Sequence, residues 1–257
     1  MGQNLMCMEN KTNASMSWTI SPDYDHIRPF LESIPGRFAR EEGLLIHNRR
    51  NQLRVLQAPD GTPMVVKAFA LPSLPNRLIY ALFRRSKAER SYRYAQRLNR
   101  QGLGSPTPVA FGEEKKNGVW FKRSYYVSVE STLPYTFFNV SDGMFQGTDT
   151  EDKFLKAVGC FTARFHNAGM LHKDYNNGNL LLGIDDKGEA HVELVDLNRI
   201  RFHRVGQKEG CRNFAERITA SPRQWSVMAR SYAEERGIDT QKCLEWIMET
   251  LNKAVKR

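Results

Sequence analysis

The residues whose types and spacing suit a defined chemistry lie between positions 171 and 199. Asp174 is followed five residues later by Asn179, and a second carboxylate, Asp196, follows an apolar run. One acid can orient or deprotonate an attacking hydroxyl, while an amide and a second acid hold the magnesium ions that bridge the phosphates of ATP. The order of these three residues is what a phosphoryl-transfer site requires.

The same stretch resembles the catalytic loop and the metal-binding loop of the protein-kinase-like superfamily. It has the pattern His-x-Asp-x-x-x-x-Asn, then a predicted strand, and then Leu-Val-Asp. This resemblance implies ATP and Mg²⁺ as cofactors, with Asp174 as the catalytic carboxylate and with Asn179 and Asp196 as metal ligands. Asn198 stands where the superfamily's Asp-Phe-Gly has glycine, and Asn is expected to adopt the left-handed conformation there.

Four residues near these three could have supporting roles in the site: His172, Lys173, Arg199 and Arg201. As a lone histidine, His172 could be a metal ligand or a general base, but the resemblance implies that its ring binds loop backbone and braces Asp174. Lys173, where protein kinases more often carry Arg, could neutralise the transferred phosphate. Arg199 and Arg201 are spaced as on a strand with a basic face, which is either solvated or in contact with an anionic substrate.

Two elements upstream must supply the rest of the site. Residues 64–69 predict a strand that carries Lys67, and residues 76–99 predict a helix, loosened near residues 84–86, that carries Glu89. A lysine on a strand could simply face solvent, and a lone acid in so basic a helix could simply relieve charge. The resemblance implies instead that Lys67 holds the α and β phosphates and that Glu89 pairs with it. The order of these residues along the chain favours the second interpretation.

The predicted elements and the resemblance together indicate an α+β, two-lobed, protein-kinase-like fold. Residues 1–20 are expected to be a disordered lead. Residues 21–130 form a small nucleotide-gripping lobe of five antiparallel strands and one long helix, in which the strands are predicted at residues 43–46, 53–57, 64–69, 119–122 and 124–130. Residues 131–257 form a short, mainly helical lobe with the catalytic loop, the metal site and the acceptor site. A hinge is expected at 128–134, and Thr148 to Glu151 predict a capping box at the start of a helix.

The composition narrows the class of protein. With 38 basic and 28 acidic residues, the formal charge of +10 predicts an anionic partner, which could be a nucleotide, a nucleic acid or a membrane surface. The four cysteines are widely separated and contain no Cys-x-x-Cys pair, so reduced thiols in a cytoplasm are expected rather than a zinc site or a disulfide framework. The first twenty residues lack the apolar run of a signal peptide, and no later run reaches the length of a membrane span.

A narrower resemblance is carried by the loop from Leu171 to Leu182, by Leu194-Val-Asp-Leu-Asn-Arg199, and by the Lys87-Ala-Glu-Arg helix ahead of Pro106-Thr-Pro-Val-Ala. Over about residues 40–205 the chain looks like the lipopolysaccharide kinase family, which includes Kdo kinases and heptose kinases. Membership implies ATP-dependent phosphorylation of a sugar hydroxyl in the inner core of lipopolysaccharide, at the cytoplasmic side of the inner membrane. The acceptor would be the lipopolysaccharide core or a lipid A precursor, with peripheral contact to the anionic membrane and no nucleic-acid partner.

Two departures from protein kinases support this narrowing. Only 61 residues follow Asp196, too few for the full helical subdomain of a typical protein kinase. The predicted first hairpin loop, residues 47–52, has no glycine where protein kinases use Gly-x-Gly-x-x-Gly.

Two alternative functions stay open. A kinase acting on a protein or a small metabolite would carry the same motifs, and a screen of acceptors would separate it. A pseudokinase that serves as a basic module would bind nucleic acid or membrane without magnesium-dependent nucleotide binding. The presence of all five expected polar residues in the expected order favours an enzyme.

Overall fold

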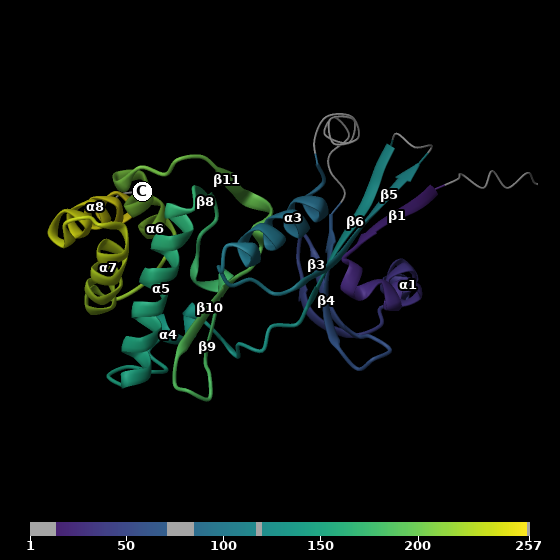
Figure 1. The fold of residues 1–257 in the computed structure, drawn as a ribbon, viewed down its shortest axis with the longest axis horizontal. Helices are drawn as coiled ribbons and strands as arrows, with labels where there is room; N and C mark the ends of the chain where they lie inside the picture. The colour runs from purple at the N-terminus through teal and green to yellow at the C-terminus, as the bar shows by residue number, and fades with distance from the viewer. Residues whose placement is uncertain (1–13, 71–84, 117–119, 256–257) are drawn as a thin grey trace, which may run out of the picture. The chain divides into compact units, whose positions relative to one another are not determined.

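The computed structural model describes residues 14–70, 85–116 and 120–255 of the chain (Figure 1). They form two compact units, each described separately below. The first contains the described residues up to Tyr92 together with Val109–Ser128, and the second contains Arg93–Pro108 and the described residues from Val129 onward. The second unit therefore begins within the segment predicted as the hinge, and it also includes Arg93–Pro108, which the sequence analysis places in the small lobe.

A six-stranded sheet forms most of the first unit, with the strand order β1-β5-β6-β4-β3-β2. Its strands are β1 (Ala14–Ile20), β2 (Leu44–Asn48), β3 (Gln52–Gln57), β4 (Pro63–Phe69), β5 (Pro108–Lys116) and β6 (Trp120–Val129). Strands β2, β3 and β4 are consecutive antiparallel neighbours, in agreement with the antiparallel strands predicted from the sequence. The predicted α+β class is confirmed, but the sheet has six strands rather than five.

The additional strand, β1, overturns part of the expected disordered lead. Residues 14–20 pair antiparallel with β5 at the edge of the sheet. Exposed Ser17 and Thr19 alternate with partly buried apolar side chains, which is the pattern of a half-buried strand. The indole of Trp18 lies over Gly112, where an added Cβ would come within 2.8 Å of the ring. The small polar residues of this segment concealed its alternation.

Strands β5 and β6 also differ from the prediction. The strands expected at 119–122 and 124–130 are one continuous strand, because Arg123 does not interrupt β6. No strand was predicted at residues 108–116 because prolines stand at positions 106 and 108, yet Pro108 begins β5. Proline is tolerated as the first residue of a strand because its missing N–H group is not required for pairing there.

Within its described residues, the first unit contains one complete α-helix and the first part of a second helix, whose residues from Arg93 onward belong to the other unit. The 3₁₀ turn Pro22–Ile27 leads into α1 (Arg28–Ala39), which was not predicted because it contains Pro35 and Gly36. Helix α1 buries Phe30, Leu31, Ile34 and Phe38. The described part of the long predicted helix is α3 (Lys87–Arg100), and residues 76–84 of that prediction lie outside the described residues. Ser86 starts α3, since its Oγ accepts a hydrogen bond from the Glu89 N–H at 3.0 Å.

The second unit is mainly helical, as predicted. Its helices are α4 (Phe137–Ser141), α5 (Asp149–Asn167), α6 (Gln207–Glu216), α7 (Pro222–Arg236) and α8 (Thr240–Val255). One small sheet has the order β10-β9-β7 (Ala190–Leu194, Leu180–Ile184, Tyr135–Thr136), and another pairs β11 (Ile200–Phe202) with β8 (Met170–His172). Within the described residues, none of the helices combines the length and the apolar character that crossing a membrane would require.

Helices α5 and α7 pack closely and form the support of this unit. An added Cβ at Gly159 of α5 would lie 2.1 Å from Ser231 Oγ and 2.5 Å from the Met228 carbonyl of α7, so α5 approaches α7 too closely at this point for a side chain at position 159. Thr148 caps α5 as predicted, accepting the Glu151 N–H at 3.2 Å. The Glu151 carboxylate does not complete the predicted capping box, however, because it accepts from the Gly147 N–H at 2.9 Å.

Candidate active site

Two antiparallel strand pairs bring the predicted residues of the second unit together. His172 of β8 pairs with Ile200 of β11, so Asp174 and Arg199 emerge at the same end of this pair. Leu180 of β9 pairs with Leu194 of β10, which places Asn179 beside the segment that carries Asp196. The Val195 N–H donates to the Asn179 carbonyl at 2.9 Å and fixes that approach.

His172 joins the two carboxylate residues through their backbone. Its Nδ1 accepts the Asp174 N–H at 3.1 Å, and its Nε2 lies 3.1 Å from the Asp196 carbonyl oxygen. Because Nδ1 accepts, the proton of the neutral ring is on Nε2 and is donated to Asp196. Burial, above all, lowers the pKa of His172, which favours this neutral form. These contacts are those of a histidine that holds loop backbone.

Asn179 is oriented by Asp174. Its Nδ2 donates to the Asp174 carbonyl at 2.8 Å, and this turns the amide oxygen Oδ1 to the opposite side. Asp196 has a left-handed backbone, with φ 57°, and Asn198 Nδ2 donates to its Oδ1 at 2.6 Å. The left-handed residue expected at Asn198 is thus Asp196, and Asn198 lies in the 3₁₀ turn Leu197–Arg199 as a partner of that carboxylate.

An amide oxygen and a carboxylate at adjoining loops are chemically suited to magnesium. Among the described residues there is no group of three or more His, Cys, Asp or Glu side chains that could hold a metal ion. Magnesium does not require one, since it usually keeps several waters and is bound by one or two carboxylates together with substrate phosphates. The residues therefore fit a metal held jointly by Asn179, Asp196 and a nucleotide.

The carboxylate of Asp174 contacts two arginines. Arg199 Nη1 donates to its Oδ2 at 3.1 Å, and Arg217 Nη1 lies 3.4 Å from its Oδ1. Arg199 was a predicted candidate for anion contact. Arg217 was missed because it follows α6, far along the chain, and belongs to no motif. The other two candidates for anion contact, Lys173 and Arg201, have exposed side chains.

A chain of buried polar groups connects the catalytic loop to the C-terminal helices, for which no role was predicted. Asn213 Nδ2 donates to the His172 carbonyl at 2.9 Å, and Asn213 Oδ1 lies 3.1 Å from His166 Nε2. His166 Nδ1 lies 2.8 Å from the Tyr232 hydroxyl, which accepts from Arg236 Nη1 at 2.9 Å. Burial lowers the pKa of His166 to about 3, so the ring is neutral.

In the first unit, the predicted lysine and glutamate lie on elements that pack against each other. Lys67 is on β4, and its Nζ is 5.4 Å from the centroid of the Phe69 ring. Phe69 shares a buried cluster with Ala88 and Tyr92 of α3, the helix that carries Glu89. Glu89 forms an ion pair with Arg85, with 3.4 Å between Oε1 and Nε. The buried cluster holds the strand of Lys67 and the helix of Glu89 together.

Comparisons with known proteins identify the family. The family model described as "Lipopolysaccharide kinase (Kdo/WaaP) family" matches residues 74–232, which is more than half of the chain. Among solved structures, WaaP in complex with acyl carrier protein is 17% identical over 92% of this chain and 98% of that chain, with a TM-score of 0.62. The Rio2 kinase–ADP/Mg²⁺–phosphoaspartate complex from Chaetomium thermophilum is 13% identical over 91% of this chain and 77% of that chain, with a TM-score of 0.48.

A search of the curated proteins finds no match. The similarity to WaaP shows a shared fold, and the family model shows the family. The chain belongs to the lipopolysaccharide kinase (Kdo/WaaP) family and is a phosphotransferase with a protein-kinase-like fold.

Proposed function

We propose that the protein transfers the γ-phosphate of ATP to a hydroxyl of a sugar, Kdo or heptose, in the inner core of lipopolysaccharide. The observation that carries this proposal is the joint positioning of Asp174, Asn179 and Asp196, in which one buried imidazole binds the backbone of both carboxylate residues. Membership of the lipopolysaccharide kinase family supports the class of acceptor.

In the proposed reaction, Asp174 orients the acceptor hydroxyl and takes its proton as the oxygen attacks the γ-phosphorus. A bond forms between that oxygen and phosphorus, the bond from phosphorus to the β–γ bridging oxygen breaks, and ADP leaves with the electron pair. Asn179 and Asp196 would hold magnesium, which supplies positive charge to the phosphates when bound. Lys67, braced by Glu89, holds the α and β phosphates. Positioning and charge stabilisation provide most of the catalysis.

The acceptor is part of a membrane lipid or of its precursor. We therefore propose that the protein works at the cytoplasmic face of the inner membrane as a peripheral protein. Its formal charge of +10 supports this location, because basic proteins are attracted to anionic leaflets.

The test is a transfer assay with purified protein, Mg-ATP labelled at the γ-phosphate, and two core saccharides that end in Kdo or in heptose. Mass spectrometry should find one added phosphate on one of them. Asp174→Asn keeps the shape of the side chain but cannot accept the proton, and should lower kcat by about 10²- to 10⁴-fold. Labelling of a protein or a small metabolite but of neither saccharide would refute the proposed acceptor. Retention of full activity by Asp174→Asn would refute the assigned role of that residue.

A further inference from the structure

The two arginines on Asp174 come from different elements and meet different atoms of its carboxylate. Arg199, just before β11, donates to Oδ2, while Arg217, just after α6, approaches Oδ1. The Asp174 side chain is 23% exposed, and those of Arg199 and Arg217 are 47% and 54% exposed. The carboxylate is thus partly covered, while both arginine side chains are about half exposed to solvent.

The charges at this point do not balance. Two guanidinium groups against one carboxylate leave one positive charge in excess, and the exposed Lys173 adjoins the same residue in the chain. Guanidinium groups present planar pairs of N–H donors that match phosphate and carboxylate oxygens. The excess charge therefore favours an anion beside Asp174.

Arg217 is held in place by a buried amide of the catalytic loop. Asn177 is 1% exposed, and its Oδ1 accepts the Thr219 N–H at 2.9 Å. Its Nδ2 donates to the Thr219 carbonyl at 2.8 Å and to Ser141 Oγ at 2.9 Å. The Asn177 side chain thus binds both backbone groups of Thr219, which lies two positions after Arg217. Asn177 therefore fixes this segment against the loop.

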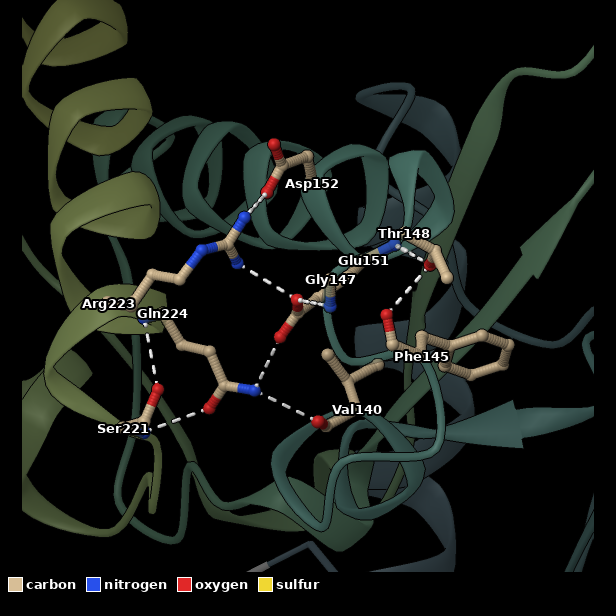
Figure 2. Close-up of polar contacts among 9 residues, drawn as sticks. All are labelled: Val140, Phe145, Gly147, Thr148, Glu151, Asp152, Ser221, Arg223 and Gln224. Atoms are coloured by element: carbon tan, nitrogen blue, oxygen red, sulfur yellow. Dashed lines mark hydrogen bonds and ion pairs between the residues drawn. The ribbon is translucent and has the colours of Figure 1, made fainter.

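The far end of the same segment is held by a second buried group (Figure 2). Glu151, 2% exposed, accepts from Gln224 Nε2 at 2.9 Å and from Arg223 Nη1 at 2.9 Å. Gln224 also donates to the Val140 carbonyl at 3.0 Å and accepts the Ser221 N–H at 2.9 Å. The residues between α6 and α7 are therefore anchored on both sides, and Arg217 projects from a fixed support.

The contacts of the two arginines indicate that they would bind the acceptor rather than the nucleotide. Asn179 binds the backbone carbonyl of Asp174, whereas Arg199 and Arg217 contact its carboxylate oxygens. In the proposed reaction, the acceptor hydroxyl is hydrogen-bonded to one of those oxygens. A guanidinium that contacts the same carboxylate is then a direct neighbour of the acceptor sugar.

We infer that Arg217 and Arg199 form a binding site for an anionic group of the acceptor, a phosphate or a carboxylate, close to the hydroxyl that is phosphorylated. This inference rests on the proposed role of Asp174, and it narrows the acceptor to a sugar that carries or adjoins a negative charge. Asn177 is a positioning residue for Arg217.

The experiment compares wild type, Arg217→Ala and Arg217→Lys on three forms of a deacylated core saccharide: untreated, stripped of phosphate, and reduced at its carboxyl groups. Arg217→Ala should raise KM for the untreated acceptor by about tenfold or more, as expected for a hydrogen bond to a charged group. Arg217→Lys should recover only part of this loss. The modified saccharide on which the effect of Arg217→Ala disappears identifies the anion as phosphate or carboxylate.

Arg212→Ala is the matched control, because Arg212 is on α6, the helix that ends just before Arg217, is similarly exposed and pairs with Glu249 instead of Asp174. It should leave KM for every acceptor unchanged. Equal losses with Arg217→Ala on all three saccharides would overturn the inference, since the arginine would then act on a group that they share.

Calorimetric binding of the same saccharides separates this inference from the proposed function. Binding that requires both Arg217 and the anion, without phosphate transfer by wild type, would support the anion site and refute the proposed reaction. Phosphate transfer by wild type, combined with binding that does not depend on the anion, would support the proposed reaction and refute the anion site.

Discussion

At the scale of single residues, the imidazole of His172 holds the two carboxylate residues of the site in place. One ring accepts from the backbone of Asp174 and donates to the backbone of Asp196, so neither residue can shift without breaking a buried hydrogen bond. A protonated ring would carry hydrogen on both nitrogens and would lose the contact to the Asp174 N–H. The loop therefore depends on a neutral histidine.

A residue-scale prediction concerns Asn177. Asn177→Ala removes both hydrogen bonds to Thr219, so Arg217 should lose its fixed position and KM for the acceptor should rise as in Arg217→Ala. The double variant should show little further loss, because both changes remove one interaction. Steady-state kinetics check this. Ser141→Ala is the control, since it removes the other Asn177 contact and leaves both bonds to Thr219 in place. Additive losses in the double variant would contradict the positioning role.

A second residue-scale prediction concerns pH. Burial lowers the pKa of His166 from an ordinary 6.5 to about 3, so between these values the unfolded chain binds the proton and the folded chain does not. The stability contributed by neutral His166 is complete above pH 6.5 and is lost as the pH falls toward 3. Between pH 5 and 6.5, the free energy of unfolding should fall by up to about 1.4 kcal/mol per pH unit from this residue. Urea titrations of wild type and His166→Gln measure it. An identical slope for the two proteins would contradict the assignment.

At the scale of elements, α5 is the support on which the catalytic loop rests. It contributes Glu151 at its first turn and His166 at its last, and it packs against α7 through Gly159. Both ends of one helix therefore hold groups that reach the loop and the segment of Arg217. A shift between α5 and α7 would disturb the site although neither helix supplies a predicted catalytic residue.

The element-scale prediction uses two helical glycines. Gly159→Ala should destabilise the protein by about 1–3 kcal/mol, because the methyl group would press on Ser231 and the Met228 carbonyl. Gly36→Ala in α1 is the matched control, since its nearest neighbour would be the Arg40 side chain at 3.4 Å. It should be neutral or stabilise by about 0.5–1 kcal/mol. Thermal unfolding of both variants tests this, and equal melting temperatures would show that α5 and α7 can separate at little cost.

At the scale of the whole molecule, local patterns predicted the elements that obey simple periodicity. Helix α5 and strands β2 to β4 occur close to where their patterns place them. The misses have physical causes. Short polar residues concealed β1, the prolines at positions 106 and 108 concealed the start of β5, and Pro35 with Gly36 concealed α1, which four buried apolar side chains stabilise.

The residues of the candidate site also fall into two groups, those that could be predicted from local patterns and those that could not. Asp174, Asn179 and Asp196 lie within one stretch of the chain, so their spacing alone indicates the chemistry. Arg217 could not be found in this way, because its approach to Asp174 depends on where α6 ends and on how Asn177 binds Thr219. Contacts set by tertiary structure leave no local trace in the sequence.

The buried chain from Arg236 to His172 has a fixed direction. Arginine can only donate, a backbone carbonyl can only accept, and the buried His166 ring is neutral, so these three conditions together determine every proton in the chain. Tyr232 must donate to His166, His166 must carry its hydrogen on Nε2, and the amide of Asn213 cannot be flipped. These hydrogen bonds therefore have a single polarity and no alternative arrangement of equal energy. The C-terminal helices thus hold the His172 carbonyl of the catalytic loop through a series of hydrogen bonds in which every donor and acceptor is determined.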